Sequence, residues 1–320
     1  MNHAFHLSAP LIASALILDA FVGDPERLPH PTRLMGAAIA RGERLLHSGD
    51  PRRDLRNGAI LAAAIIALSA AAAWAAIGVC DRIDRSFGAI AAVAVAWTTL
   101  AARGLDDAAG EVQRALLARD EAAARLAIPA LVGRDPHSLD REGMIRAAVE
   151  SVAENASDGV IAPMLYLFAA GPVGAIAYKA INTLDSMIGH RDARYTRFGR
   201  FAARIDDAAN WIPARLTAIC IAAASEIWLR RGRQAIAIVR RDARRHESPN
   251  AGFPEAAMAG GLGVQLGGPA VYDGDTIVHP RIGDPVCPAT IDDIASARII
   301  LRIATVIAFF AIAIARAVLT

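Results

Sequence analysis

The stretch GAILAAAIIALSAAAAWAAIGVC, residues 58–80, decides the fold, because its length and its lack of charge suit a lipid bilayer. An α-helix needs about 20 apolar residues to cross the hydrocarbon core of a membrane. The run Ile299–Leu319 meets the same condition, since Arg302 and Arg316 stand near its ends, where arginine side chains can extend to the interface. Four further apolar runs are Leu7–Val22, Phe87–Ala102, Gly159–Ile181 and Trp211–Leu229.

The composition agrees with a membrane protein that also has large aqueous parts. Of the 320 residues, 54% are hydrophobic and 21% are charged. This mixture predicts an all-α, polytopic helical membrane protein with substantial cytoplasmic helical and loop segments. The lipid bilayer is therefore an expected partner. The net charge of +2 argues against a nucleic-acid partner. Cys80, Cys220 and Cys287 are odd in number and far apart, which favours reduced thiols.

Two of the apolar runs contain residues that disfavour a simple membrane crossing. Gly159–Ile181 is interrupted by GPVG at residues 171–174, and Trp211–Leu229 contains proline, arginine and glutamate. We therefore expect broken, re-entrant or protein-packed segments around Gly171 and Pro213. Irregular backbone at membrane depth is tolerated only where it lines protein or a wet cavity, so a binding cavity is expected nearby.

The placement of arginine predicts an orientation, because cytoplasmic loops are enriched in basic residues. Asp24–Asn57 and Arg103–Asp158 hold seven arginines each, whereas the turn Asp81–Ser86 has two arginines offset by two aspartates. The first two segments are therefore expected inside and the turn outside. Asn182–Asn210 and Arg230–Asn250 are also basic, and a single full crossing between them could not leave both inside.

These patterns divide the chain into five segments. They are N-terminal membrane helices with a polar loop at 24–57 (1–102), a cytoplasmic helical segment (103–158), a membrane-embedded catalytic segment (159–229), a cytoplasmic glycine-rich segment (230–297) and a C-terminal membrane helix (298–320). Between Pro249 and Pro288 the density of glycine and proline predicts mostly loop with short elements.

One polar cluster lies where a helix, expected over Ser138–Asn155, reaches the membrane. An apolar stripe at helical spacing comprises Leu139, Ile145, Val149 and Val152. The opposite face carries Glu142, Arg146, Glu150 and Glu154 at i, i+4 spacing, aimed toward Asp158. This face is either solvated, with ion pairs along the helix, or forms with the following NASDG an oxygen-rich pocket suited to Mg²⁺.

A second polar cluster spans Ile181–Leu216. Asn182, Asp185 and Ser186 supply oxygen atoms, and Asp206 with Asp207 forms an acidic pair. The arginines between them are Arg191, Arg194, Arg197, Arg200 and Arg204. Acids beside arginines form either mutual salt bridges or a metal–phosphate site in which arginine holds phosphate oxygens.

The glycine-rich stretch Ser248–Gly268 could bring backbone N–H groups close to an anion, or it could be a surface loop. A Walker A loop is excluded, because the only lysine, Lys179, does not lie in a G-K-[ST] sequence. His30 and His190 are isolated, and a lone histidine is more often structural than catalytic.

Five stretches together resemble the membrane-bound adenosylcobinamide-phosphate synthases of cobalamin biosynthesis. GDPERLPHPTRLMG, SVAENASDGVIAP, NTLDSMIGHRDARYTRFG, RIDDAANWIPARL and SPNAGFPEAAMAGGLGVQLGG occur in that family's order. The resemblance covers residues 19 to about 284, and the five motifs in register make it specific, although each alone would be weak. His190 departs from the tyrosine common at its position.

The resemblance implies an ATP-dependent acid–amine ligase. Such an enzyme joins the corrin-ring propionate of adenosylcobyric acid to aminopropanol or its O-phosphate, at the cytoplasmic face of the inner membrane. Activation of a carboxylate, most simply as an acyl phosphate, calls for Mg²⁺, arginines that neutralise phosphate and a base for the incoming ammonium. Other cobalamin-biosynthesis enzymes, or further copies of the chain, are possible partners.

We expect the matching residues to carry this chemistry. The expected catalytic residues are Glu154, Asp158 and Asp185. The expected Mg²⁺ ligands are Glu150, Glu154, Asp158, Asp185, Asp206 and Asp207. The expected substrate and phosphate contacts are His30, Arg33, Asn155, Ser157, Asn182, Arg191, Arg194, Asn210, Arg215 and Asn250.

Two other classes of function compete with this reading. A membrane prenyltransferase would also bind Mg²⁺ through aspartates in a helical bundle, but NTLDS and RIDDAAN lack the close D-x-x-x-D spacing expected of one. A non-enzymatic transporter or sensor would share the membrane helices, but not the long polar segments rich in Asp, Asn and Arg.

Overall fold

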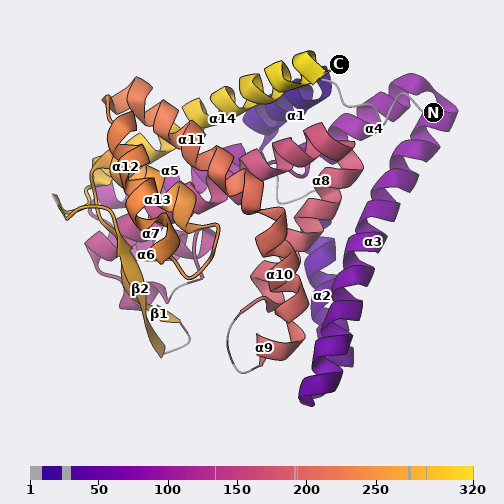
Figure 1. Ribbon diagram of the computed structural model, residues 1–320, viewed down its shortest axis with the longest axis horizontal. Coiled ribbons are helices and arrows are strands. Elements are labelled where there is room, and N and C mark those ends of the chain that lie inside the picture. The colour runs from indigo at the N-terminus through magenta and orange to yellow at the C-terminus, as the bar shows by residue number, and fades with distance from the viewer. Residues whose placement is uncertain are drawn as a thin grey trace. The chain divides into compact units, whose positions relative to one another are not determined.

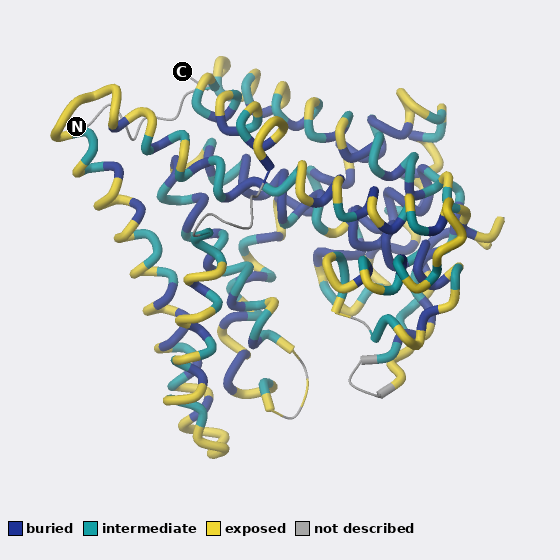
Figure 2. Tube along the Cα trace, turned by 180° about the vertical axis from the view of Figure 1, so that it is seen from behind, coloured by how far each residue is buried: buried dark blue, intermediate teal, exposed yellow. Residues whose placement is uncertain are grey.

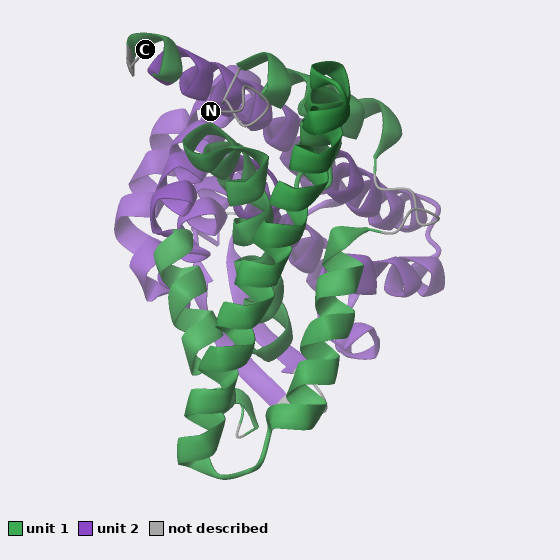
Figure 3. Cartoon of the chain, turned by 90° about the vertical axis from the view of Figure 1, so that its right-hand side faces the viewer, with its two compact units in different colours: residues 1–101, 162–210, 316–320 green, residues 102–161, 211–315 purple. Residues whose placement is uncertain are grey.

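The computed structural model describes residues 9–23, 30–133, 135–190, 192, 194–272, 275–285 and 287–319. Nearly all regular structure in these residues is helical, and one two-stranded sheet is present (Figure 1). The all-α prediction is confirmed, with that small sheet as an addition. By contact the chain divides into two compact units, each assembled from separate stretches of sequence (Figure 3).

Over the described residues the predicted apolar runs are mostly helical; Leu7 and Ser8 lie outside those residues, and the run Phe87–Ala102 leaves the helix after Trp97. They lie in α1 (Ala9–Val22), α3 (Pro51–Ile83), α4 (Arg85–Trp97), α8 (Ala162–Ile188), α11 (Trp211–Leu229) and α14 (Ile291–Leu319). By length and composition, five helical segments could cross a membrane: Pro51–Ile83, Arg85–Leu117, Arg141–Ile188, Trp211–Leu229 and Ile291–Val318. The chain is therefore a multi-pass membrane protein.

Unit 1 comprises residues 1–101, 162–210 and 316–320. Besides α1, α3, α4 and α8 it contains α2 (Pro31–Leu46), α9 (Tyr195–Phe198) and α10 (Arg200–Ala209). The long helix α3 packs against α2, α4 and α8. Asp84 ends α3 and caps α4, so these two helices form a helical hairpin. The core of this unit gathers Met35, Ile39, Leu61, Leu184, Ile188 and Phe198.

The close approach of α3 to α9 depends on a glycine. A Cβ atom at Gly58 would lie 1.8 Å from the carbonyl oxygen of Phe198, whereas a Cβ at Gly78 of the same helix meets nothing within 4 Å. We expect Gly58→Ala to lower the free energy of unfolding by at least about 2 kcal/mol, because backbone must move. Gly78→Ala should leave stability equal or slightly higher. Thermal unfolding in detergent measures both, and equal midpoints would contradict the packing.

The predicted break at Gly171 is present. Gly171 has φ 68° and ψ −167°, which divides α8 into two helical pieces, and Pro172 begins the second. Pro213, in contrast, does not break α11, because it lies in the first turn, where backbone N–H groups have no partner within the helix. The discontinuity near it falls at Asn210, where α10 ends.

Unit 2 comprises residues 102–161 and 211–315. Its first stretch forms α5 (Ala102–Leu117), α6 (Glu121–Ala127), the short helices η2 (Ile128–Ala130) and η3 (Pro136–Ser138), α7 (Arg141–Asn155) and the π-helical η4 (Ala156–Ile161). The second forms α11, α12 (Gly232–Asp242), η5 (Ala243–Arg245), α13 (Gly252–Leu262), a hairpin and α14. Helices α11, α12 and α13 pack on one another, and α7 and α13 are buried along most of their length (Figure 2).

The prediction of mostly loop over Pro249–Pro288 was wrong. This stretch contains α13 and an antiparallel hairpin of β1 (Leu266–Tyr272) and β2 (Asp275–Ile282). Glycine here allows close packing instead of loop. Gly260 of α13 lies against the backbone of Ala235 in α12, and Gly267, at φ 80°, sits in a register shift between Leu266 and Gly268.

An ion cluster joins α5 to α14. Asp106, 6% exposed, accepts hydrogen bonds from Arg298 (Nη2 to Oδ2, 3.0 Å) and from Arg302 (Nη2 to Oδ2, 2.6 Å). Arg298 also donates to Gln113. Arg302 was expected to extend from a helix end toward the interface. Because α14 begins at Ile291, Arg302 is instead well within the length of the helix and not near its end. Asp106 compensates its charge there.

Candidate functional site

The residues predicted to form the site are divided between the units, and each unit is described by itself. Unit 1 contains His30, Arg33, Asn182, Asp185, Arg194, Asp206, Asp207 and Asn210. Unit 2 contains Glu150, Glu154, Asn155, Ser157, Asp158, Arg215 and Asn250. Arg191 lies outside the described residues.

In unit 2 the predicted acidic cluster lies where α7 passes into the π-helical turn η4. Short π-helical turns are rare and occur often at functional sites. Ser157, 1% exposed, has no hydrogen-bond partner for its hydroxyl oxygen among the described residues. Asp158 is half-buried beside it. A buried hydroxyl without a partner is costly, which distinguishes this turn from an ordinary helix end.

Glu150 does not lie on a solvated face. It is 4% exposed, and its Oε1 accepts the N–H of Gly267 in β1 at 2.6 Å, so the carboxylate holds the hairpin to α7. Between Ala147 and Ala153 the helix is buried all round, which makes the predicted division into apolar and polar faces wrong there. The surface pair Glu142–Arg146 does form, and Glu154, one turn after Glu150, is exposed.

Arg215 and Asn250, predicted from separate motifs, are brought together. The Arg215 guanidinium lies between two aromatic rings, 4.4 Å from the ring centre of Trp211 and 4.1 Å from that of Phe253. Its Nη1 donates to Asn250 Oδ1 at 2.9 Å. Asn250 is 5% exposed, so this contact fixes the arginine against a buried amide.

In unit 1 a buried polar chain links α8 to the end of α10. Tyr178 donates its hydroxyl to Asn210 Oδ1 at 2.8 Å, and Asn210 Nδ2 donates to Asp206 Oδ2 at 3.0 Å. Tyr166 stacks on Tyr178 and donates to the Ala209 carbonyl. The predicted residues Asp206 and Asn210 are therefore neighbours, and the two tyrosines are members that the sequence did not indicate. Asp207 is half-buried on the same helix.

Arg194 binds a carboxylate of its own unit. Its Nη2 and Nε donate to Glu43 Oε1 at 2.6 and 2.9 Å, and Tyr195 donates to the same oxygen. Hydrogen bonding to Glu43 raises the pKa of Arg194, and burial raises the pKa of Tyr195. The arrangement joins α2 to the start of α9. Of the two alternatives left open for the arginines of this segment, Arg194 therefore forms the salt bridge.

The remaining predicted residues of unit 1 lie at the start of α2 and on α8. His30 caps α2, and its Nδ1 lies 2.6 Å from Thr32 Oγ1, while Arg33 is exposed. Asn182 and Asp185 are half-buried one turn apart on α8. A Cβ at Gly189 would lie 2.0 Å from Asp185 Oδ1, so the absence of a side chain there leaves room for this carboxylate.

Carboxylate oxygens suit Mg²⁺, and three of its predicted ligands lie in each unit. Over the part of the chain that the structure describes, no three His, Cys, Asp or Glu side chains are grouped closely enough to hold an ion. The magnesium ligands stay a prediction.

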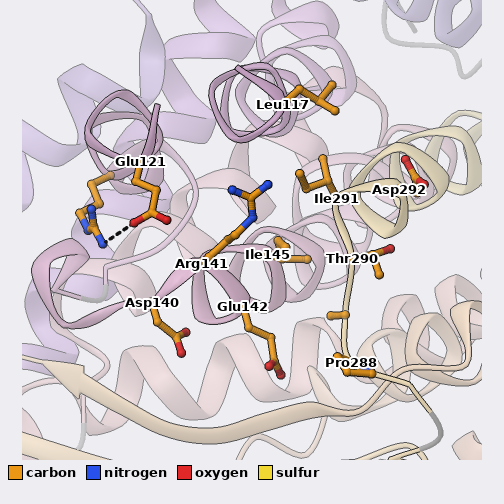
Figure 4. Close-up of a pocket in the computed structure, with 12 residues that line it drawn as sticks. Leu117, Glu121, Asp140, Arg141, Glu142, Ile145, Pro288, Thr290, Ile291 and Asp292 are labelled. Atoms are coloured by element: carbon orange, nitrogen blue, oxygen red, sulfur yellow. Dashed lines mark hydrogen bonds and ion pairs between the residues drawn. The ribbon is translucent and has the colours of Figure 1, made fainter. Parts of the chain in front are cut away.

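Unit 2 also has a pocket of about 880 Å³ that the sequence did not indicate (Figure 4). It lies where α5 ends and where α7 and α14 begin, with Leu117, Ile145 and Ile291 in its wall. The Arg141 guanidinium points toward the helix that carries Leu117, whereas Asp140 and Glu142 point the opposite way. Arg141 donates to the Leu116 carbonyl. In the sequence, Asp140 and Thr290 are residues typical of the position just before a helix. They indicate where α7 and α14 begin, but they do not indicate a pocket.

His246, which precedes Asn250 in the chain, is expected to make the folding stability depend on pH. Its Nδ1 accepts the N–H of Ser248, its Nε2 lies 3.6 Å from Glu255, and burial lowers its pKa below the usual 6.5. The unfolded chain takes up a proton near pH 6.5 but the folded chain only at lower pH, so stability should fall as pH drops below about 6.5. His246→Gln should flatten the slope of melting temperature against pH between 7 and 5. An unchanged slope would contradict this.

Three comparisons place the chain among known proteins. A family profile described as "CobD/Cbib protein" matches residues 12–301. The "Cobalamin biosynthesis protein CobD" of Geobacter metallireducens is 44% identical over 282 residues, 87% of each chain. The "Cobalamin biosynthesis protein CbiB" of Salmonella typhimurium is 39% identical over 296 residues, 92% of this chain and 93% of its own. No solved structure matches significantly.

Proposed function

Because the chain belongs to the CobD/CbiB family and acts in cobalamin biosynthesis, we propose that it forms the amide bond between a corrinoid carboxylate and an amine. The proposed substrates are adenosylcobyric acid and aminopropanol or its O-phosphate, with ATP and Mg²⁺. One observation carries the proposal: the family match runs from residue 12 to residue 301 and includes every motif that led to it.

The reaction sets definite tasks for the chain's residues. A C–N bond forms at the carboxyl carbon, a C–O bond breaks there, and the ammonium must lose a proton before its nitrogen can attack. ATP, when bound, supplies the phosphoryl group that makes the carboxylate oxygen a leaving group. We assign the proton transfer to Glu154, Asp158 or Asp185. Arg215, held between two rings, is suited to orient an anionic group.

Turnover by the purified chain tests the proposal. The protein in detergent receives adenosylcobyric acid, ATP and Mg²⁺, with either aminopropanol or its O-phosphate, and mass spectrometry follows the amide product. Product that requires ATP is expected with at least one amine. A folded preparation that forms no amide with either amine would overturn the proposal.

The proposed location is the inner membrane with the site facing the cytoplasm, where ATP is present. Single cysteines at Ser138 and Thr196, both exposed, report on this, after replacement of Cys80, Cys220 and Cys287. Neither position should react with an impermeant thiol reagent added to intact cells, and both should react after lysis. Strong labelling from outside at either position would contradict the orientation.

A further inference from the structure

Two arginines of unit 2 lie near each other without a carboxylate. Arg215 donates only to neutral acceptors: the Trp211 carbonyl at 2.7 Å, Asn250 Oδ1 and, at 3.3 Å, the Pro249 carbonyl. Arg244 is exposed on η5 and follows Ala243, whose carbonyl oxygen lies against Gly252 in the turn that holds Arg215. Neither guanidinium forms an ion pair within the described part of the chain. No acid of the described residues therefore compensates either positive charge.

The neighbouring arginines differ in this respect. Arg241 and Arg245 both pair with the buried Asp242, at 2.7 and 3.1 Å, and Arg241 also reaches Asp284. Hydrogen bonding from Arg241 lowers the pKa of Asp242, which keeps that carboxylate ionised. An acid is thus available to the same short segment, yet among the described residues Arg244 does not pair with it.

The backbone around the two arginines is held tightly. The N–H groups of Asn250 and Ala251 both donate to Ser248 Oγ, and the Asn250 carbonyl accepts the N–H of Phe253. A Cβ at Gly252 would lie 2.2 Å from the Ala243 carbonyl oxygen, so the turn that holds Arg215 rests directly on η5, which carries Arg244. The fold therefore places the backbone that carries Arg244 beside the turn that holds Arg215.

The donor geometry suits a phosphate group. Nε of Arg215 makes no hydrogen bond to the described residues, and Nη2 makes only the long one to Pro249, which leaves an N–H fork for two oxygens of one anion. A phosphate monoester carries a charge of about −1.5 to −2 at pH 7, which matches two arginines better than a single carboxylate would. The two rings hold the guanidinium plane in place.

We propose that Arg215 and Arg244 together bind a phosphate group of a substrate, with Trp211, Phe253 and Asn250 holding Arg215 in position. The assignment to a substrate rests on the proposed function. The phosphate belongs either to the nucleotide or to the O-phosphorylated amine, which share this chemistry.

Binding to the full chain in detergent tests the proposal independently of turnover. Calorimetry follows ATP, aminopropanol O-phosphate and unphosphorylated aminopropanol, and inorganic pyrophosphate serves as a probe in thermal unfolding. The variants are Arg244→Gln and Arg215→Lys. The matched control is Arg240→Gln, which also removes an exposed arginine from this segment.

Arg244→Gln is expected to weaken one phosphorylated ligand about 10- to 100-fold, which corresponds to the loss of a charge-assisted hydrogen bond. The control and the binding of unphosphorylated aminopropanol should not change. The ligand that weakens, ATP or aminopropanol O-phosphate, identifies the source of the phosphate. Arg215→Lys should weaken the same ligand, because lysine keeps the charge but lacks the fork.

The outcomes separate this proposal from the proposed function. If the chain forms no amide but pyrophosphate raises the melting temperature of wild type and not of Arg244→Gln, the phosphate site stands and the substrate assignment fails. If both variants, folded, bind ATP, aminopropanol O-phosphate and pyrophosphate within twofold of wild type, the proposal is overturned, whatever the turnover.

Discussion

Replacing Asp158 or Asp185 with alanine is expected to lower turnover about a thousandfold or more while each protein stays folded. Each variant removes a carboxylate proposed to move a proton or to hold Mg²⁺, and such groups act mainly in the transition state. Asp158 lies in the π-helical turn beside the buried Ser157 hydroxyl, and Asp185 lies on α8 against Gly189. The rate of amide formation at saturating substrates measures the effect.

Asp107→Ala is the matched control, because Asp107 is an exposed aspartate of unit 2 whose one ion pair among the described residues is with Arg103. It should leave the rate within twofold of wild type. Melting temperatures of the variants separate lost chemistry from lost folding. If Asp158→Ala and Asp185→Ala both keep near-normal rates, their carboxylates are structural and the assignment of the catalytic residues fails.

Asp106→Asn is expected to be the most destabilising single substitution considered for unit 2. It leaves Arg298, which is 19% exposed, and Arg302 without their shared carboxylate. Breaking a buried ion pair by removing one partner typically costs about 3–5 kcal/mol, and the greater exposure of Arg302 favours the lower end, about 3 kcal/mol. The loss should appear as a lower midpoint in denaturant titration or thermal unfolding.

The next residue of the same helix provides the control. Asp107→Asn removes an exposed pair, 51% exposed at Asp107, and should cost less than about 1 kcal/mol. Equal losses for the two variants would mean that the Asp106 cluster contributes no more than a surface ion pair.

The apolar helices and the break at Gly171 could be predicted because each depends on local sequence. Charge-free runs such as residues 58–80 specify a membrane helix wherever they occur, and a Gly-Pro pair interrupts one. The hairpin could not be predicted in the same way. Glycine at 267 and 268 suggested loop, whereas pairing with β2 and the hydrogen bond to Glu150 fix it as a strand. Of these partners, Glu150 lies 117 residues away from Gly267 in the chain, so the local sequence could not indicate it.

The candidate site shows the same division. The resemblance indicated Arg215 and Asn250 separately, and the structure shows that they touch. Their aromatic neighbours, and Arg244 beside them, could not be singled out, because the Arg230–Asn250 segment holds seven arginines that look alike in sequence. Whether an arginine of this segment pairs with Asp242 depends on how α12 and η5 pack, which the local sequence does not specify.

The ion cluster of α5 and α14 has a consequence for biosynthesis. Asp106 and Arg298 are 192 residues apart in the chain, so at roughly 5–20 residues per second the ribosome needs on the order of 10–40 s to make the second after the first. Throughout that interval Asp106 has no arginine from α14. Its carboxylate must therefore stay in water, or next to a substitute partner, until the last helix emerges.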